Sequence, residues 1–254
     1  MATATQSLLP RRRQAKAESR FPGFSSDAIS FLRGLERNNK REWFQPRKAI
    51  YEQQVRAPLE SLVHCINAEL AEFAPRLVTP ASKAVFRIYR DTRFSKDKRL
   101  YKTHIAATFY LQNLGKAAGP CFYFHFTPKE LLIFAGVYMP EREELIAIRN
   151  LLSERHSEFR ELMRARSLRN LMGDLQGEQL SRLPKGFPKD HPAEDLIRHK
   201  QWFVETTIAG GIVTSSRMLP EIVSRFRAAA PMIEFLAQPF VQQSRPRRLP
   251  FMAF

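Results

Sequence analysis

Aromatic side chains alternate with a period of two between residues 121 and 127, and this pattern limits the fold more than any other stretch of the chain. Phe122, Phe124 and Phe126 fall on one face of an extended strand, while Tyr123 and His125 fall on the other. A short Pro-Lys-Glu connection then leads into an apolar stretch at residues 131–139. The sequence therefore predicts an antiparallel hairpin with one buried face.

Four extended stretches follow one another along the chain, joined by short or moderate loops. They cover residues 85–94, 105–111, 121–127 and 131–139. Such connections favour antiparallel pairing, because parallel strands need long crossovers. Helical patterns come before and after the strands without alternating with them, although residues 201–208 also look extended. The predicted fold class is α+β, an antiparallel sheet of at least four strands covered by N-terminal and C-terminal helices.

Apolar residues at helical spacing predict several helices before the sheet. Ser26 or Asp27 is expected to cap the first one, and the asparagines at 38–39 to end it, since asparagine tolerates the left-handed conformation. Separate helices are expected from about Pro46 and from near Pro58, because proline is well placed in a first helical turn.

Further helices are predicted after the sheet. One starts at the acidic residues that follow Pro140, and a further helical stretch carries Phe159. Residues 195–200 look helical. Ser215 or Ser216 is expected to cap a helix that runs towards residue 229, and Pro231 to open a last one.

Length and composition fit a folded domain between two basic ends. The 254 residues are 44% hydrophobic, which is enough for a sizeable core. We expect a disordered basic arm at residues 1–20, a single α+β domain at 21–240 and a basic tail at 241–254. The net charge is +16, and more than half of it belongs to residues 21–240. A basic body makes anionic partners, a small ligand or a nucleic acid, more plausible than cationic ones. Equally, the excess charge could serve solubility alone.

The two cysteines, Cys65 and Cys121, form no CxxC motif and no disulfide framework, which favours a reducing compartment. No stretch reaches the length of a membrane span, and the N-terminus lacks the apolar core of a secretory signal. A cytoplasmic protein without a membrane partner is therefore expected. We predict no metal and no cofactor, since Cys121 and His125 lie too far apart on a strand to share an ion and no nucleotide-binding motif occurs.

The segment from residue 87 to 103 concentrates basic and hydrogen-bonding side chains on a strand and turn. Arginine forks and lysines of this density suit a phosphate or a carboxylate group. In the alternative interpretation, the two aspartates satisfy neighbouring arginines and cap the turn without any ligand. The predicted ligand-binding residues are Arg87, Arg90, Asp91, Arg93, Asp97, Lys98, Tyr101 and Lys102.

Strand alternation divides this segment between two faces. It places Arg90 with Phe86, Ile88 and Phe94, opposite the face that carries Arg87, Tyr89, Asp91 and Arg93. Arg90 would then be a partly buried charge that needs an acidic partner or a bound anion.

Two histidines lie close enough in sequence to this segment to act with it. His125 shares a strand face with Tyr123, and His104 directly follows Tyr101-Lys102-Thr103. Either could be a catalytic proton carrier near an arginine cluster. Each could equally be a half-buried histidine that is hydrogen-bonded to a neighbour. The sequence identifies no reaction, so whether the protein is an enzyme stays open.

Several motifs of the chain occur together in one known family. They are Asn38-Asn39-Lys40-Arg41-Glu42-Trp43-Phe44, the run Arg-Ile-Tyr-Arg-Asp-Thr-Arg-Phe-Ser-Lys-Asp-Lys at residues 87–98, Tyr101-Lys102-Thr103, Gly136 with Tyr138 and Pro140, and Lys185-Gly186-Phe187 with His191-Pro192. Over residues 24–235 the chain resembles a microbial family of conserved hypothetical proteins, the domain of unknown function family 2461. The resemblance implies an α+β domain and carries no established activity. Arg99-Leu100 departs from the family pattern, in which a small residue and a proline precede Tyr-Lys-Thr.

A nucleic-acid-associated binding protein is the alternative function. A basic body with basic ends and aromatic strand residues is typical of proteins that bind single strands. The phenylalanines at 122, 124 and 126 nevertheless alternate as core residues do. Trp43 and Phe44 could offer a stacking platform, but are better explained as an aromatic plug where two helices meet.

Overall fold

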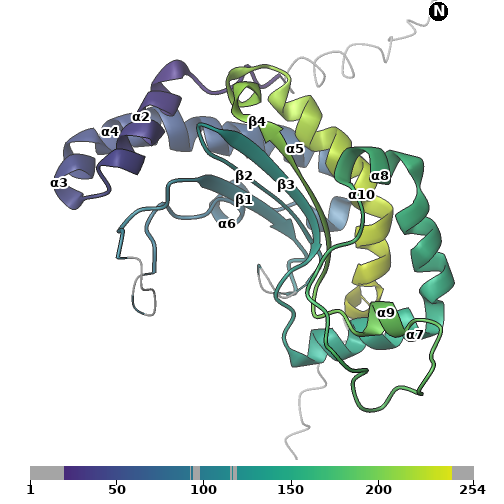
Figure 1. Ribbon diagram of the computed structural model, residues 1–254. Helices are drawn as coiled ribbons and strands as arrows, with labels where there is room; N and C mark the ends of the chain where they lie inside the picture. The colour runs from purple at the N-terminus through teal and green to yellow at the C-terminus, as the bar shows by residue number, and fades with distance from the viewer. Residues whose placement is uncertain (1–19, 92, 94–97, 115, 117–118, 242–254) are drawn as a thin grey trace, which may run out of the picture.

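The computed structural model describes residues 20–91, 93, 98–114, 116 and 119–241 (Figure 1). Nearly all of the predicted basic arm and of the basic tail lies outside these residues, as does Asp97.

Four strands form one antiparallel sheet in the order β1-β2-β3-β4. They are β1 (Ile105–Tyr110), β2 (Cys121–Phe126), β3 (Glu130–Val137) and β4 (Trp202–Ala209). The α+β class and the antiparallel sheet covered by helices are thus confirmed. The fourth strand, however, comes from the extended stretch predicted at 201–208, and it pairs with β3.

The prediction of a strand over residues 85–94 is wrong: the described residues of this stretch form no regular strand. Only isolated bridges join it to the following segment, Val85 to Ala107 and Tyr89 to Tyr101. Between these bridges the pairing register shifts by two residues, so two extra residues lie on the 101–107 side. A bulge of this kind interrupts the ladder and bends the chain. Burial still alternates as predicted, with Ile88 buried and Tyr89 exposed.

The N-terminal helices begin with α2, which Ser25 caps rather than Ser26 or Asp27. The Ser25 Oγ accepts a hydrogen bond from the amide of Ala28 at 3.2 Å. The helix ends before Asn38, as predicted, but the φ of Asn38 is −129°, so this residue is not left-handed. The bounds are α2 (Ser26–Arg37), α3 (Arg41–Phe44), η1 (Gln45–Arg47), α4 (Lys48–Ile50), η2 (Tyr51–Arg56), α5 (Ala57–Phe73), η3 (Pro75–Leu77) and α6 (Ala81–Ala84).

The separate helices predicted from Pro46 and Pro58 form one continuous helical run. The turn before Pro58, η2, is a π-helix, and the Ala57 amide donates to the carbonyl of Glu52. A proline ring inside an α-helix clashes with the carbonyl four residues earlier. The wider π-turn makes room for it, so the chain passes through the proline without a break.

Helices α7 and α10 are longer than predicted, whereas α9 is shorter. Their bounds are α7 (Arg142–Arg164), α8 (Arg166–Met172), α9 (Glu194–Ile197), η4 (Gly210–Thr214) and α10 (Met218–Val241). The two helical stretches predicted after Pro140 merge into α7, which has a kink at Arg155. Pro231 does not open a new helix but lies inside α10, because buried residues on both sides of it keep the helix packed on the core.

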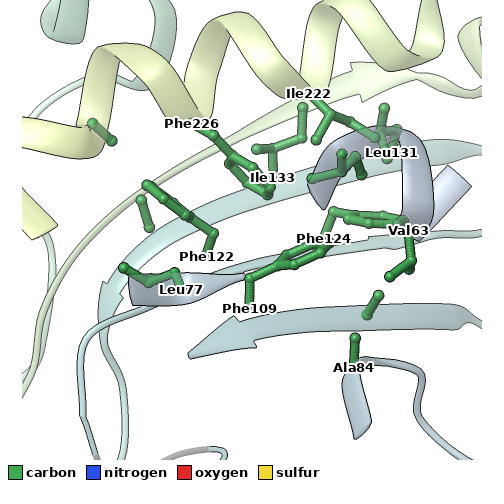
Figure 2. Close-up of a cluster of buried hydrophobic side chains, with 14 of the residues drawn as sticks. Val63, Leu77, Ala84, Phe109, Phe122, Phe124, Leu131, Ile133, Ile222 and Phe226 are labelled. Atoms are coloured by element: carbon green, nitrogen blue, oxygen red, sulfur yellow. The ribbon is translucent and has the colours of Figure 1, made fainter. Parts of the chain in front are cut away.

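Helix α10 covers one face of the sheet, and α5 packs beside it (Figure 1). Phe122 stacks on Phe226 of α10 with ring centroids 4.5 Å apart, and Phe124 lies in the same cluster (Figure 2). Phe124 and Phe126 are fully buried. The Trp43–Phe44 pair belongs to the core, as predicted, since Phe44 is buried. Among the described residues, no helix combines the length and the apolar character that crossing a membrane requires.

Gly136 in β3 gives the first test of this architecture. Its φ is +144°, and an added Cβ would lie 2.5 Å from Phe203 Cα and closer still to the carbonyl oxygen of Trp202. We expect Gly136→Ala to lower the free energy of unfolding by at least about 2 kcal/mol in urea titrations. Gly211→Ala is the control, because nothing lies within 4 Å of the added atom. Equal effects of both substitutions would contradict the close approach of β3 and β4.

Candidate functional site

The face of the sheet opposite α10 carries a cavity of about 420 Å³. We call this the outer face. One row of directly opposed residues crosses it from β1 to β4, namely Thr108, Tyr123, Phe134 and Glu205. The cavity is lined by Phe86, Thr108, Lys116, Cys121, Tyr123, His125, Leu132, Phe134, Tyr138, Met139 and Glu205. The alternation that buries the β2 phenylalanines places Tyr123 and His125 on the opposite face, as predicted, and there both line this cavity.

Lys116 lines the β1 edge of the cavity, and Lys102 shares the Phe86 ring with it. The Nζ atoms of Lys102 and Lys116 lie 5.0 Å and 4.9 Å from the centre of the Phe86 ring. Burial lowers the pKa of both lysines, and the positive charges of Arg87, Lys116 and Arg90 lower that of Lys102 further. In the part of the chain that the structure describes, neither ammonium group forms an ion pair with a carboxylate. The pair is therefore a partly buried concentration of positive charge.

The two histidines singled out from the sequence lie side by side. The ring centroids of His104 and His125 are 5.1 Å apart, and the Tyr123 hydroxyl lies 3.1 Å from Nδ1 of His125. Burial lowers the pKa of His104 to about 4, aided by the positive charges of His125, Lys102 and Arg90. Burial also lowers the pKa of His125, and it raises that of Tyr123 to about 12. At neutral pH the cluster therefore holds two neutral imidazoles and a protonated phenol.

Asn39 fixes the backbone that carries Lys102 and His104. Its Oδ1 accepts from the Tyr101 amide and its Nδ2 donates to the Tyr101 carbonyl, both at 2.9 Å. The Tyr101 ring is buried and stacks on Phe44 with centroids 4.2 Å apart. Tyr101 thus anchors the segment in the core, rather than facing the cavity. Two motifs that are distant in sequence are joined here, and both help to position Lys102.

Asp91 and Arg93 neutralise each other away from the cavity. The Arg93 Nε and Nη2 donate to the two carboxylate oxygens of Asp91 at 3.0 Å and 2.7 Å. These hydrogen bonds lower the pKa of Asp91 to about 2. Both side chains are exposed. The pair matches the alternative interpretation of the sequence, in which an aspartate satisfies a neighbouring arginine.

The other predicted ligand residues are spread around the segment. Arg90 is half-buried, and its charge affects Lys102 and His104. Arg87 is exposed and lines a separate cavity of about 320 Å³ between η2 and residues 85–89. Lys98 is exposed, and Asp97 lies outside the described residues. The structure therefore brings Arg90, Lys102 and the two histidines together, and the charge of Arg87 acts on Lys102 from the neighbouring cavity. The other predicted ligand residues lie elsewhere.

The sequence analysis did not identify the cavity residues on β3 and β4, nor Lys116. Strand alternation would have assigned Thr108, Phe134 and Glu205 to one face, but only with the strand order known. Lys116 comes from the loop between β1 and β2, where no pattern points to it. His191, which belongs to one of the family motifs, accepts a hydrogen bond from the Ala193 amide just before α9 at 3.0 Å. Among the described residues, no group of three or more His, Cys, Asp or Glu side chains could hold a metal ion.

Comparison with known proteins gives one family match. A family model described as "Conserved hypothetical protein (DUF2461)" matches residues 27–235, which is most of the chain. No curated protein matches the chain.

The histidine cluster predicts a specific pH dependence of stability. An unfolded histidine has a pKa of about 6.5, whereas that of folded His104 is about 4. Between these values the unfolded chain binds more protons, so stability is complete above pH 6.5 and falls as the pH falls towards 4. Because His104 is half-buried, we expect a loss on the order of 1 kcal/mol in urea titrations at pH 7 and pH 4.5.

The His104→Gln variant should lose less stability over this pH range than the wild type, because glutamine does not titrate. His64→Gln, which changes an exposed histidine on α5, should retain the wild-type pH dependence. The same pH dependence in all three proteins would show that His104 is not shielded from water.

Proposed function

The chain belongs to the DUF2461 family of conserved hypothetical proteins, and we propose that it binds a small organic anion in the cavity on the outer face of the sheet. The anionic group, a phosphate or a carboxylate, lies at the Lys102–Lys116 end. The body of the ligand lies against the apolar walls.

The lysine pair is the observation that carries the proposal. Two ammonium groups are half-buried against one ring, and no carboxylate of the described residues pairs with them. Holding like charges in this way costs free energy, which the lowered pKa values of both lysines express. A bound anion would offset that cost through charge-assisted hydrogen bonds. Arg90 adds positive charge on the same side.

The walls of the cavity favour an organic body over a bare inorganic ion. Leu132, Phe134 and Met139 offer mainly carbon surface beyond the lysine end. A volume of about 420 Å³ lies in the range typical of small-molecule sites. Should the ligand be a substrate, His125 is the proton carrier, since it lines the cavity and contacts both Tyr123 and His104.

The alternative of nucleic-acid binding finds less support. The phenylalanine stripe of β2, which would have to stack on bases, is fully buried beneath the helices. Phe44 is likewise buried in the core and offers no platform. The basic arm and tail that motivated this alternative lie outside the described residues.

Titration calorimetry and thermal melting with octanoate, octyl phosphate and neutral octanamide test the proposal. We expect the two anions to raise the melting temperature, by about 3 °C at ten times the dissociation constant, and octanamide to bind at least ten-fold more weakly than octanoate. Lys102→Gln and Lys116→Gln should each weaken anion binding about ten-fold.

Lys83→Gln serves as the control. It removes the same charge from an exposed lysine of α6, and should leave affinity unchanged. If neither anion binds to the wild-type protein, the proposal is wrong. It is also wrong if all three lysine variants bind the anions as tightly as the wild type does.

A further inference from the structure

Glu205 is an acidic group at the opposite side of the same cavity. It lies on the edge strand β4, directly across from Phe134, and its side chain is half-buried. Within the described ranges it has no ion pair and no side-chain hydrogen bond. Glu221 of α10, in contrast, is held by Arg217 and Arg225. The Glu205 carboxylate lines the cavity, so a ligand there can supply hydrogen-bond donors to it in place of water.

Aromatic rings gather beside this carboxylate. Phe134 and Tyr138 both line the cavity, with ring centroids 6.0 Å apart, and Phe203 packs against both at 5.0 Å and 5.9 Å. Tyr138 is 51% exposed, so its ring is open to a ligand. The faces of aromatic rings attract cations, and ammonium ligands are recognised by several rings together. The β4 side of the cavity is therefore suited to a positively charged group.

The cavity thus has a positive side near β1 and a negative side at β4. Lys116 lines one side and Glu205 the other, yet the two form no ion pair. Tyr123 and Glu205 are separated by two strand spacings, or about 10 Å, and Phe86 lies on the far side of Tyr123. Leu132 and Phe134 occupy the space between. Two opposite charges, neither of which has an ion pair among the described residues, are therefore held apart by an apolar floor.

We propose that the ligand is bipolar: its anionic group binds at Lys102 and Lys116, its ammonium group binds at Glu205 between Phe134 and Tyr138, and an apolar spacer of at least about 10 Å joins the two. This inference rests on the proposed anion site and names the chemical class that fills it. Long-chain ω-amino carboxylates and amine-bearing organic phosphates are such ligands. One molecule of this class satisfies both ends of the cavity, which a simple anion cannot do.

Titration calorimetry with octanoate, 8-aminooctanoate and 4-aminobutyrate separates this inference from the proposed function. We expect 8-aminooctanoate to bind about ten-fold more tightly than octanoate. The shorter 4-aminobutyrate cannot span the cavity and should gain nothing from its amine. In the Glu205→Gln variant, which keeps the side-chain shape, the affinity for 8-aminooctanoate should fall to that for octanoate, while octanoate itself binds at least as well as to the wild type.

The matched control is Glu154→Gln on the exposed side of α7, which should keep the wild-type preference for the amine. Thermal melting of each variant confirms that it is folded. Equal affinities of the wild type for octanoate and 8-aminooctanoate would overturn the inference and leave the anion site standing. A preference that persists in Glu205→Gln would overturn it too, because the ammonium group would then bind elsewhere. If neither carboxylate binds, the anion site itself is refuted, and the inference with it.

Discussion

The burial of three phenylalanines on β2 is the constraint from which the rest of the structure follows. Phe122, Phe124 and Phe126 are completely shielded from water beneath the helices. Because a strand turns successive side chains to opposite faces, this burial forces Tyr123 and His125 onto the outer face. The hydrophobic effect that stabilises the core thus also orients the polar groups of the candidate site. A shift of β2 by one residue would exchange the two faces, which the core does not permit.

A second constraint places the remaining charges around that outer face. Asn39 holds both backbone groups of Tyr101, and Phe44 stacks on its ring, so Lys102 emerges from a fixed point. His104 lies just before β1, two residues from Ala106, which opposes His125, and its ring lies beside that of His125. The Asn39 and Phe44 motif and the Tyr101-Lys102-Thr103 motif are far apart in the sequence, but they contact each other at this edge of the outer face. Both motifs are needed to build the segment that carries Lys102 and His104.

Sequence patterns predicted the structure correctly where contacts between residues close in the chain determine it. Period-two alternation was sufficient to find β1 to β3 and the orientation of His125. The strand prediction failed at residues 85–94, because a two-residue bulge depends on the partner strand. The helix start predicted at Pro231 was wrong, because packing of α10 outweighs the cost of a proline. Lys116 and Glu205 were out of reach for the same reason. Their meeting in one cavity depends on loop closure and strand order, and no local pattern encodes either.

The hydrogen bonds from Asn39 to Tyr101 span 62 positions of the chain, and this separation has a kinetic consequence. Closing so long a loop carries an entropic cost before any contact repays it. The segment from Tyr101 to His104 can therefore adopt its native position only after the N-terminal helices have packed against the sheet. Amide hydrogen exchange at Tyr101 consequently reports the detachment of those helices, and ordering of this corner is a late event in folding.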